Sequence, residues 1–290
     1  MFSHKVPAFR FMGGEMDGIV DGTFELDPMA LPDDLVNPEC PNDMNSSNWL
    51  AILPHANFSA PLIGPYPENQ SLKPSWSEQD FTRGQIWAVY SGTDFTPRQY
   101  ARINDVVLVN QVCVTFLEPQ PVLDHEIQWH RENLPIVSGI FKVGRTTLNL
   151  EMSWFSHSVK CQRSMTKPFY KIYPMKGEIW AMYKNWNNKW KQSDYKSYQC
   201  WIVEILSDFT EEKCMRIVRL VEVKGCMTFF QRQRYDDFEL TRTVSQADML
   251  AFSHRIPAFR VPGVRKYSIP EASWHLEPDA LPPKLSNMCS

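Results

Sequence analysis

Three Phe-Ser-His tripeptides are the residues of this sequence whose types suit covalent chemistry. They begin at Phe2, Phe155 and Phe252. A serine hydroxyl becomes a nucleophile when a histidine ring nitrogen takes its proton. Adjacency in sequence does not by itself place the hydroxyl on that nitrogen, and the recurrence of the tripeptide favours a structural histidine that hydrogen-bonds to backbone. We therefore expect no catalytic residue here.

Signatures of other catalytic, cofactor and metal sites are missing from the sequence. There is no glycine-rich phosphate loop after a strand, no His-Glu-x-x-His motif and no paired carboxylates at catalytic spacing. The seven cysteines include no Cys-x-x-Cys pair, which disfavours zinc and indicates a reducing compartment, the nucleus or the cytosol. We predict a protein that is not an enzyme and uses no metal or cofactor.

Charge and hydropathy limit the partners. The net charge of −3 disfavours nucleic acid, whose phosphates a basic face would have to neutralise. A basic run from Arg216 to Arg234 keeps nucleic acid as a minor alternative, although solvated charges on β-strands are the favoured interpretation. The sequence lacks an apolar stretch of the roughly 18 residues that a membrane span needs, so we expect no membrane partner.

Two tryptophans point instead to a protein partner. Trp186 and Trp190 lie four residues apart in the polar run 185–191. Large aromatic side chains in such a run are hard to bury together, and aromatic residues dominate the binding energy of many protein interfaces. This spacing favours a binding role for the loop.

The elements that must position these residues are mostly short strands. Runs of β-branched and aromatic residues are bounded by turn residues, and helix signals such as the capping box at 245–248 are few. The runs form two similar sets, which predicts a mainly β fold of two related small barrels packed together, in units 81–167 and 168–258. The expected strands are 84–90, 100–103 and 112–117, and then 177–183, 202–205 and 215–220.

A second repeat concerns the ends of the sequence. Residues 2–10 recur as 252–260 and residues 24–32 recur as 274–282, at the same offset and without a gap. We interpret 1–35 as the C-terminal tail of a preceding domain copy or as a tail that docks on the body. By the same logic 259–290 is the tail of the second unit, and the proline-rich segment 36–80 is a linker.

Several ordered blocks of the sequence lie at 116–119, 134–136, 171–181, 184–186, 252–257 and 280–283. Together they resemble the plant domain of unknown function 3444. Members of that family usually lie C-terminal to a J domain, sometimes as tandem copies. The resemblance implies a nuclear, chromatin-linked or co-chaperone role and supplies no catalytic residues. The chain lacks the His-Pro-Asp signature of a J domain, so alone it is not expected to stimulate an Hsp70.

Each unit is also similar, more distantly, to Tudor-like chromatin barrels. In such barrels aromatic rings form a cage around a methylated ammonium group, each contact contributing about 0.5–2 kcal/mol. The resemblance therefore implies a peptide partner, with a methylated histone tail as ligand; the alternative is a co-chaperone or adaptor that docks a nuclear partner or client without a cage. The matching positions are Tyr90 and Phe116 with Trp129 and Glu118 in the first unit, and Tyr183 with Trp186 or Trp190 in the second.

Overall fold

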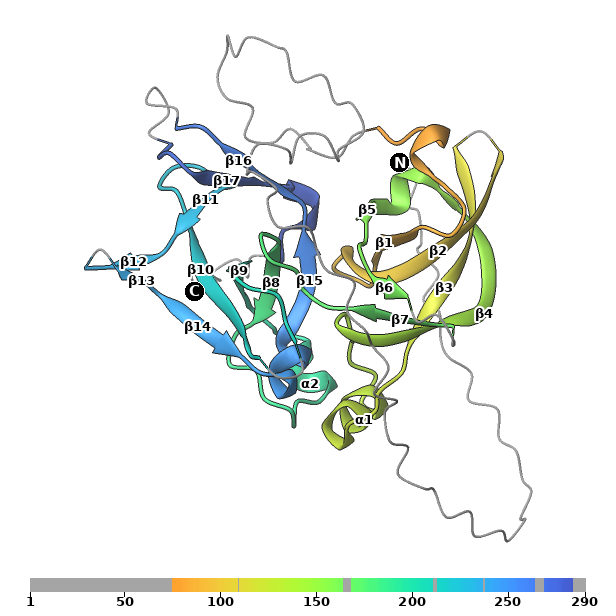
Figure 1. The fold of residues 1–290 in the computed structure, drawn as a ribbon, viewed down its shortest axis with the longest axis horizontal. Coiled ribbons are helices and arrows are strands. Elements are labelled where there is room, and N and C mark those ends of the chain that lie inside the picture. The colour runs from red at the N-terminus through yellow and green to blue at the C-terminus, as the bar shows by residue number, and fades with distance from the viewer. Residues whose placement is uncertain are drawn as a thin grey trace, which may run out of the picture. The chain divides into compact units, whose positions relative to one another are not determined.

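The computed structural model describes residues 75–283 except for 109, 164–167, 211–212, 237 and 264–268 (Figure 1). The expected tail at 1–35 and all but the end of the expected linker at 36–80 lie outside the described residues. Both sheets discussed below belong to one compact body of the chain. Within the described segments, none of the helices has the length and apolar character to span a membrane.

The first β unit is a seven-stranded antiparallel sheet in the order β5-β1-β2-β3-β4-β7-β6. One short helix, α1 (Asp124–Arg131), lies between β3 and β4 in the chain. The strands are β1 (Ile86–Ser91), β2 (Thr96–Leu108), β3 (Gln111–Pro119), β4 (Gly139–Glu151), β5 (Phe155–Ser158), β6 (Gln162–Arg163) and β7 (Phe169–Ile172), with 3-10 turns η2 (Glu78–Asp80) and η3 (Met152–Trp154).

The second β unit repeats this order as β15-β8-β9-β10-β11-β17-β16, with β14 paired to β10. A two-stranded hairpin, β12 (Arg234–Tyr235) and β13 (Phe238–Glu239), projects from it (Figure 1). The other elements are β8 (Ile179–Tyr183), α2 (Gln192–Tyr195), β9 (Cys200–Ile205), β10 (Met215–Glu222), β11 (Phe229–Arg232), β14 (Thr241–Val244), η4 (Gln246–Ala251), β15 (Phe252–Ile256), β16 (Ala258–Val261), β17 (Ser273–Leu276) and η6 (Pro278–Ala280). The prediction of a mainly β fold with curled, barrel-like sheets and few short helices is confirmed.

The central strands are buried on both faces. Because successive side chains of a strand point to opposite sides, Trp87 and Val89 pack in one core of the first unit while Ile86 and Ala88 pack in another. The second unit does the same with Trp180 and Met182 against one core and Ile179 and Ala181 against the other. Two-sided burial explains why these strands read as continuous apolar runs rather than as alternating ones.

The sheets extend beyond the unit boundaries expected from the sequence. β7 pairs with β4 and so completes the first sheet, although 168–172 were assigned to the second unit. Likewise β16 and β17 belong to the second sheet, since β17 pairs with β11, so the expected tail 259–290 contributes structure rather than trailing from it. The physical reason is that each curled sheet needs these returning strands to cover the second core.

Candidate binding site

Aromatic side chains gather at the end of β8, as the sequence predicted for the second unit. Tyr183 ends that strand, and Trp186 and Trp190 follow in the loop. All three rings pack against Trp129, and those of Tyr183 and Trp190 also contact each other. The centroid of the Trp129 ring lies 6.5, 6.3 and 6.2 Å from those of Tyr183, Trp186 and Trp190. We call this group the second-unit cluster; its members are Trp129, Tyr183, Trp186, Trp190, Tyr195 and Tyr198.

Trp129 was expected in a cage of the first unit, and that expectation is wrong. The residue lies on α1, which carries its side chain away from the first sheet into the second-unit cluster, where it is fully buried. Its indole Nε1 donates to the carbonyl of Pro135 at 2.9 Å, which fixes the ring. The buried rings Trp129, Tyr183 and Tyr198 thus form a packed core rather than an open cage.

A cation of the chain itself already contacts this cluster. The guanidinium carbon of Arg98, from β2 of the first unit, lies 5.1 Å from the Tyr198 ring centroid and 5.7 Å from that of Tyr195. Only 6% of Arg98 is exposed. Cation–π attraction strengthens when the cation is desolvated, so the cluster holds Arg98 much as a cage would hold a ligand.

Hydrogen bonds complete the environment of Arg98. Its nitrogens donate to Asp94 Oδ2 at 2.5 Å, to the Tyr198 hydroxyl at 2.7 Å and to Ser253 Oγ at 3.0 Å. Burial favours the neutral form of Arg98, but the surrounding tyrosines and Asp94 outweigh it and raise its pKa above the ordinary value. Burial likewise opposes ionisation of Asp94, yet Arg98 and the Tyr198 hydroxyl lower its pKa. The pair stays charged and links the two β units.

The first unit carries a different aromatic group from the one expected. Tyr90 at the end of β1 stacks on Phe95, with centroids 5.2 Å apart and an interplanar angle of 4°. Trp154, just before β5, lies 5.5 Å from Phe95 with its plane inclined by 60°. Phe95 is 45% exposed, whereas Tyr90 is buried. We call Tyr90, Phe95 and Trp154 the first-unit aromatic group.

Phe116 and Glu118 do not join Tyr90. Phe116 shares a face of β3 with Val112 and Val114 and packs against the first core. Glu118 is solvent-exposed, and its closest ion-pair partner is Lys142 at 4.0 Å. The expected first cage of Tyr90, Phe116, Trp129 and Glu118 is therefore not assembled, because strand alternation and α1 direct its members to different places. The polar turn that ends at Asp94 was visible in the sequence, but nothing there marked the next residue, Phe95, as exposed.

In the two Ser-His pairs that the structure describes, the hydroxyl does lie beside a ring nitrogen, which adjacency in sequence alone could not establish. Ser156 Oγ lies 3.0 Å from His157 Nδ1, and Ser253 Oγ lies 2.9 Å from His254 Nδ1. The other ring nitrogen of His254 lies 2.8 Å from the carbonyl of Ala280, which only accepts, so Nε2 donates and Nδ1 accepts from the serine. The predicted structural histidine bonded to backbone is confirmed at this position.

We expect this histidine to make stability depend on pH. Burial and Arg98 lower the pKa of His254 to about 3, so the ring stays neutral in the fold while an unfolded chain takes up a proton below its usual pKa of 6.5. Its stabilising contribution is present above pH 6.5 and is lost as the pH falls towards 3, about 2 kcal/mol by pH 5. Urea unfolding at pH 5 and pH 7.5 measures this, and His254→Ala should show a smaller difference between the two pH values.

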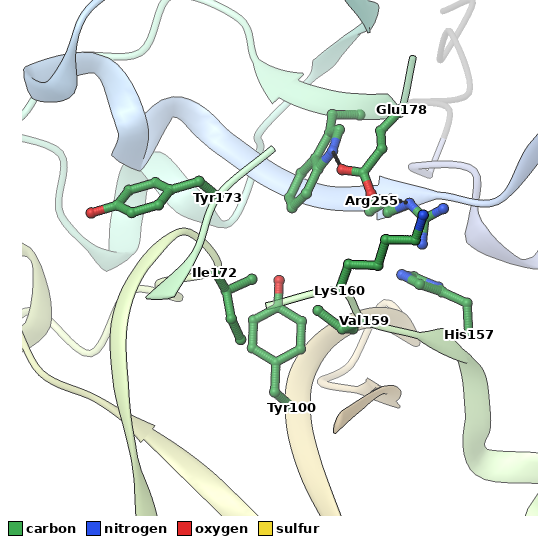
Figure 2. A pocket seen from close by; sticks show the side chains of 9 residues that line it. Tyr100, His157, Val159, Lys160, Ile172, Tyr173, Glu178 and Arg255 are labelled. Atoms are coloured by element: carbon green, nitrogen blue, oxygen red, sulfur yellow. Dashed lines mark hydrogen bonds and ion pairs between the residues drawn. The ribbon is translucent and has the colours of Figure 1, made fainter. Parts of the chain in front are cut away.

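A small cavity lies where the two β units meet (Figure 2). Tyr100 and His157 line it from the first unit, and Glu178 and Arg255 line it from the second, where they form an ion pair at 3.1 Å. Its volume of about 10 Å³ suits a single water molecule. Such a space cannot admit a peptide side chain. Elsewhere in the described part of the chain, no group of three or more His, Cys, Asp or Glu residues is arranged to hold a metal ion.

Comparison with known proteins gives one positive finding. The family model described as "Domain of unknown function (DUF3444)" matches residues 64–265, a range that includes most of both sheets. No curated protein and no solved structure matches the chain. The blocks 171–181 and 252–257 lie inside the matched range, whereas the repeated segment 2–32 lies outside it.

Proposed function

The chain belongs to the DUF3444 family, and we propose that it is a non-enzymatic module that binds a peptide of a nuclear protein partner. The first-unit aromatic group is the contact site, and the ligand group is a basic side chain, with methylated lysine of a histone tail as the ligand to test first. The observation that carries the proposal is the exposed, strained Phe95.

Phe95 combines two costly features. Its φ of +52° is a left-handed conformation that bulky side chains rarely adopt. The same residue exposes 45% of its surface, although an aromatic ring gains free energy from burial. Strain of this kind costs on the order of 1–3 kcal/mol and tends to occur where function requires it. A presented binding ring explains both features together.

The second unit indicates what such a group binds. Tyr90 and Tyr183 lie at matching positions near the ends of equivalent strands, since β1 and β8 occupy the same place in the two sheets. In the second unit Tyr195 and Tyr198, which pack against Tyr183, receive the guanidinium of Arg98. At the first-unit group, none of the cation–π contacts between described residues involves the Phe95 ring. A cation supplied by a partner can take that place.

Methylated lysine fits the geometry of the group. One face of Phe95 lies on Tyr90, the Trp154 ring is inclined to it by 60°, and 45% of Phe95 stays exposed. A methylated ammonium group is poorly hydrated and gains about 0.5–2 kcal/mol from such faces.

A second candidate function rests on the β12–β13 hairpin. Tyr235 and Phe238 face each other across this two-stranded ladder and are 71% and 78% exposed. Exposed aromatic pairs on a projecting hairpin are typical anchors for a protein partner. An adaptor or co-chaperone module would dock a partner or client here and would ignore lysine methylation.

The deciding experiment is a binding screen of the purified chain on modified and unmodified histone peptides. We expect methyl-dependent binding, weakened about tenfold or more by Phe95→Asn, since tenfold corresponds to about 1.4 kcal/mol. Asparagine tolerates the left-handed conformation, so this variant should stay folded while losing the ring. Trp154→Ala should weaken binding in the same direction.

Tyr235→Ala with Phe238→Ala is the matched control, because it removes two exposed aromatic rings without touching the first-unit group. Binding that survives Phe95→Asn but is lost in the hairpin variant would reject the proposal in favour of the adaptor function. Binding that does not distinguish methylated from unmodified peptides would reject the methyl-lysine ligand.

A further inference from the structure

The second unit contains a buried carboxylate held by cations. Glu204 on β9 is almost fully buried. Arg232 donates to both of its oxygens, at 2.7 and 2.8 Å, and Arg260 donates to one of them at 2.8 Å. The indole Nε1 of Trp274 completes the set at 3.0 Å. Such charge-assisted, bidentate pairing is the strong form of carboxylate recognition.

The first unit has the same backbone hydrogen bonds at the corresponding place, but the residue in the position of Glu204 is positively charged. Gly84 N–H donates to Ile103 O as Gly177 N–H donates to Ile205 O, both at 2.8 Å. Arg102 and Glu204 immediately precede those acceptors, so Arg102 occupies the position of Glu204.

Two of the three partners on the neighbouring strands, Arg260 and Trp274, correspond as well, whereas the place of Arg232, opposite Leu220, is held in the first unit by Val143, opposite Leu117. Arg163 on β6 lies opposite Tyr170 on β7, as Arg260 on β16 lies opposite Trp274 on β17. Tyr170 in turn pairs with Phe141, as Trp274 pairs with Phe230. In the first unit Arg163 therefore takes the place of Arg260, and the guanidinium of Arg102 takes the place of the Glu204 carboxylate.

A cavity lies at this position in the first unit. Its volume is about 150 Å³, enough for several water molecules at about 30 Å³ each and hence for a carboxylate or phosphate group. Three guanidinium groups line it, yet none of them forms an ion pair with a residue that the structure describes. Arg102 Nη2 donates to Asn104 Oδ1 at 3.3 Å, which orients it. The lining residues are Arg83, Gly84, Arg102, Ile103, Asn104, Arg163 and Tyr170.

We propose that this cavity binds an oxyanion, the carboxylate or phosphate group of a side chain on a protein partner. The three guanidinium groups around this cavity repel one another. An anion between them would reduce that repulsion and would accept hydrogen bonds from their N–H groups. In the second unit Glu204 supplies the negative charge from within the chain; in the first unit the partner supplies it. A protein partner is favoured over nucleic acid by the net charge of −3. This site is separate from the first-unit aromatic group.

The test is a titration with inorganic phosphate at constant ionic strength, read by calorimetry and by the shift in melting temperature. Arg102→Glu places a carboxylate where the second unit has Glu204. We expect this variant to stay folded and to bind phosphate about tenfold or more weakly, because the loss of a charge-assisted contact is compounded by a new negative charge. Arg163→Ala, at an exposed position, should weaken phosphate binding without affecting folding.

Arg242→Glu is the matched control, since it makes the same charge change at an exposed position of β14 and should bind phosphate as the parent does. Phe95→Asn should also keep the phosphate response, which separates this site from the proposed function. The inference is overturned if the parent chain does not bind phosphate, or if Arg102→Glu binds it as well as Arg242→Glu does.

The source of the anion is tested with three probes of the parent chain, namely a phosphoserine peptide, its glutamate counterpart and a single-stranded oligonucleotide. If either peptide binds more tightly than the oligonucleotide, and this binding is lost in Arg102→Glu, a protein partner is supported. The peptide that binds more tightly of the two then shows whether the site prefers phosphate or carboxylate. Tighter binding of the oligonucleotide, falling steeply with salt, overturns the assignment to a protein partner.

Discussion

Replacing Arg98 by alanine should lower the free energy of unfolding by about 3–5 kcal/mol, the usual cost of removing one partner from a buried ion pair. The substitution leaves the Asp94 carboxylate without its cation and removes donors to the Tyr198 hydroxyl and Ser253 Oγ. It also withdraws the guanidinium from the faces of Tyr195 and Tyr198. Chemical denaturation followed by fluorescence of the tryptophans in the second-unit cluster measures the loss.

Because Arg98 and Asp94 belong to the first unit while Tyr198 and Ser253 belong to the second, the variant should also uncouple the units. Unfolding in two transitions is expected where the parent chain unfolds in one. Arg98→Lys should recover part of the stability, since an ammonium keeps the charge but lacks the planar fork. Arg242→Ala, at an exposed position, should change the free energy of unfolding by less than about 0.5 kcal/mol. If Arg98→Ala changed the free energy of unfolding as little as Arg242→Ala does, Arg98 would not be what links the two units.

The contact that Arg98 makes between the two units changes the interpretation of the second-unit cluster. The resemblance to Tudor-like barrels implied that Tyr183, Trp186 and Trp190 bind a ligand from outside. The structure packs the three rings around Trp129, and it places the chain's own Arg98 over Tyr195 and Tyr198 of the same cluster. The cluster is therefore better suited to linking the units than to recognition.

The fold class followed from the sequence because its signals are local and repeated. Gly84–Tyr90 and 177–183 share residue types at each position, and the structure gives both the same strand, the same glycine contact and the same tryptophan hydrogen bond. Trp87 Nε1 donates to Gln85 Oε1 and Trp180 Nε1 to Glu178 Oε2, each at 2.9 Å. Because the two segments have similar residues, the sequence pattern that predicts β1 in the first unit also predicts β8 in the second.

The site was harder to predict because it depends on contacts between distant segments. The sequence places Trp129 near the first unit, but only tertiary packing decides that α1 delivers it to the second-unit cluster. Strand alternation could have assigned Phe116 to the core, together with Val112 and Val114. Phe95 combines its exposure with a left-handed backbone, a conformation that no local preference of phenylalanine predicts.

The buried Glu204 gives the second large prediction. Glu204→Ala should lower the free energy of unfolding by about 3–5 kcal/mol, because Arg260 then loses its ion-pair partner and Arg232 keeps only Glu239 as a counter-charge. Glu118→Ala is the matched control, since that carboxylate is 48% exposed at its side chain and lies 4.0 Å from Lys142; a change within about 0.5 kcal/mol is expected there. Urea denaturation at pH 7 compares the two variants, and equal effects would contradict the account of the Glu204 network.

The pH dependence separates the charge of Glu204 from its packing. Burial alone would raise the pKa of Glu204, but hydrogen bonds from Arg232 and Trp274 and the charge of Arg260 outweigh it and lower the pKa below the usual 4.5. The folded state therefore holds the proton less tightly than the unfolded chain, so the stabilising contribution is complete above pH 4.5 and disappears as the pH falls through the lowered value. Glu204→Gln keeps the size of the side chain and cannot titrate. It should be less stable than the parent at pH 7, and the difference between the two should shrink on acidification; a difference that stays constant down to pH 3 would show that packing, rather than charge, makes Glu204 important.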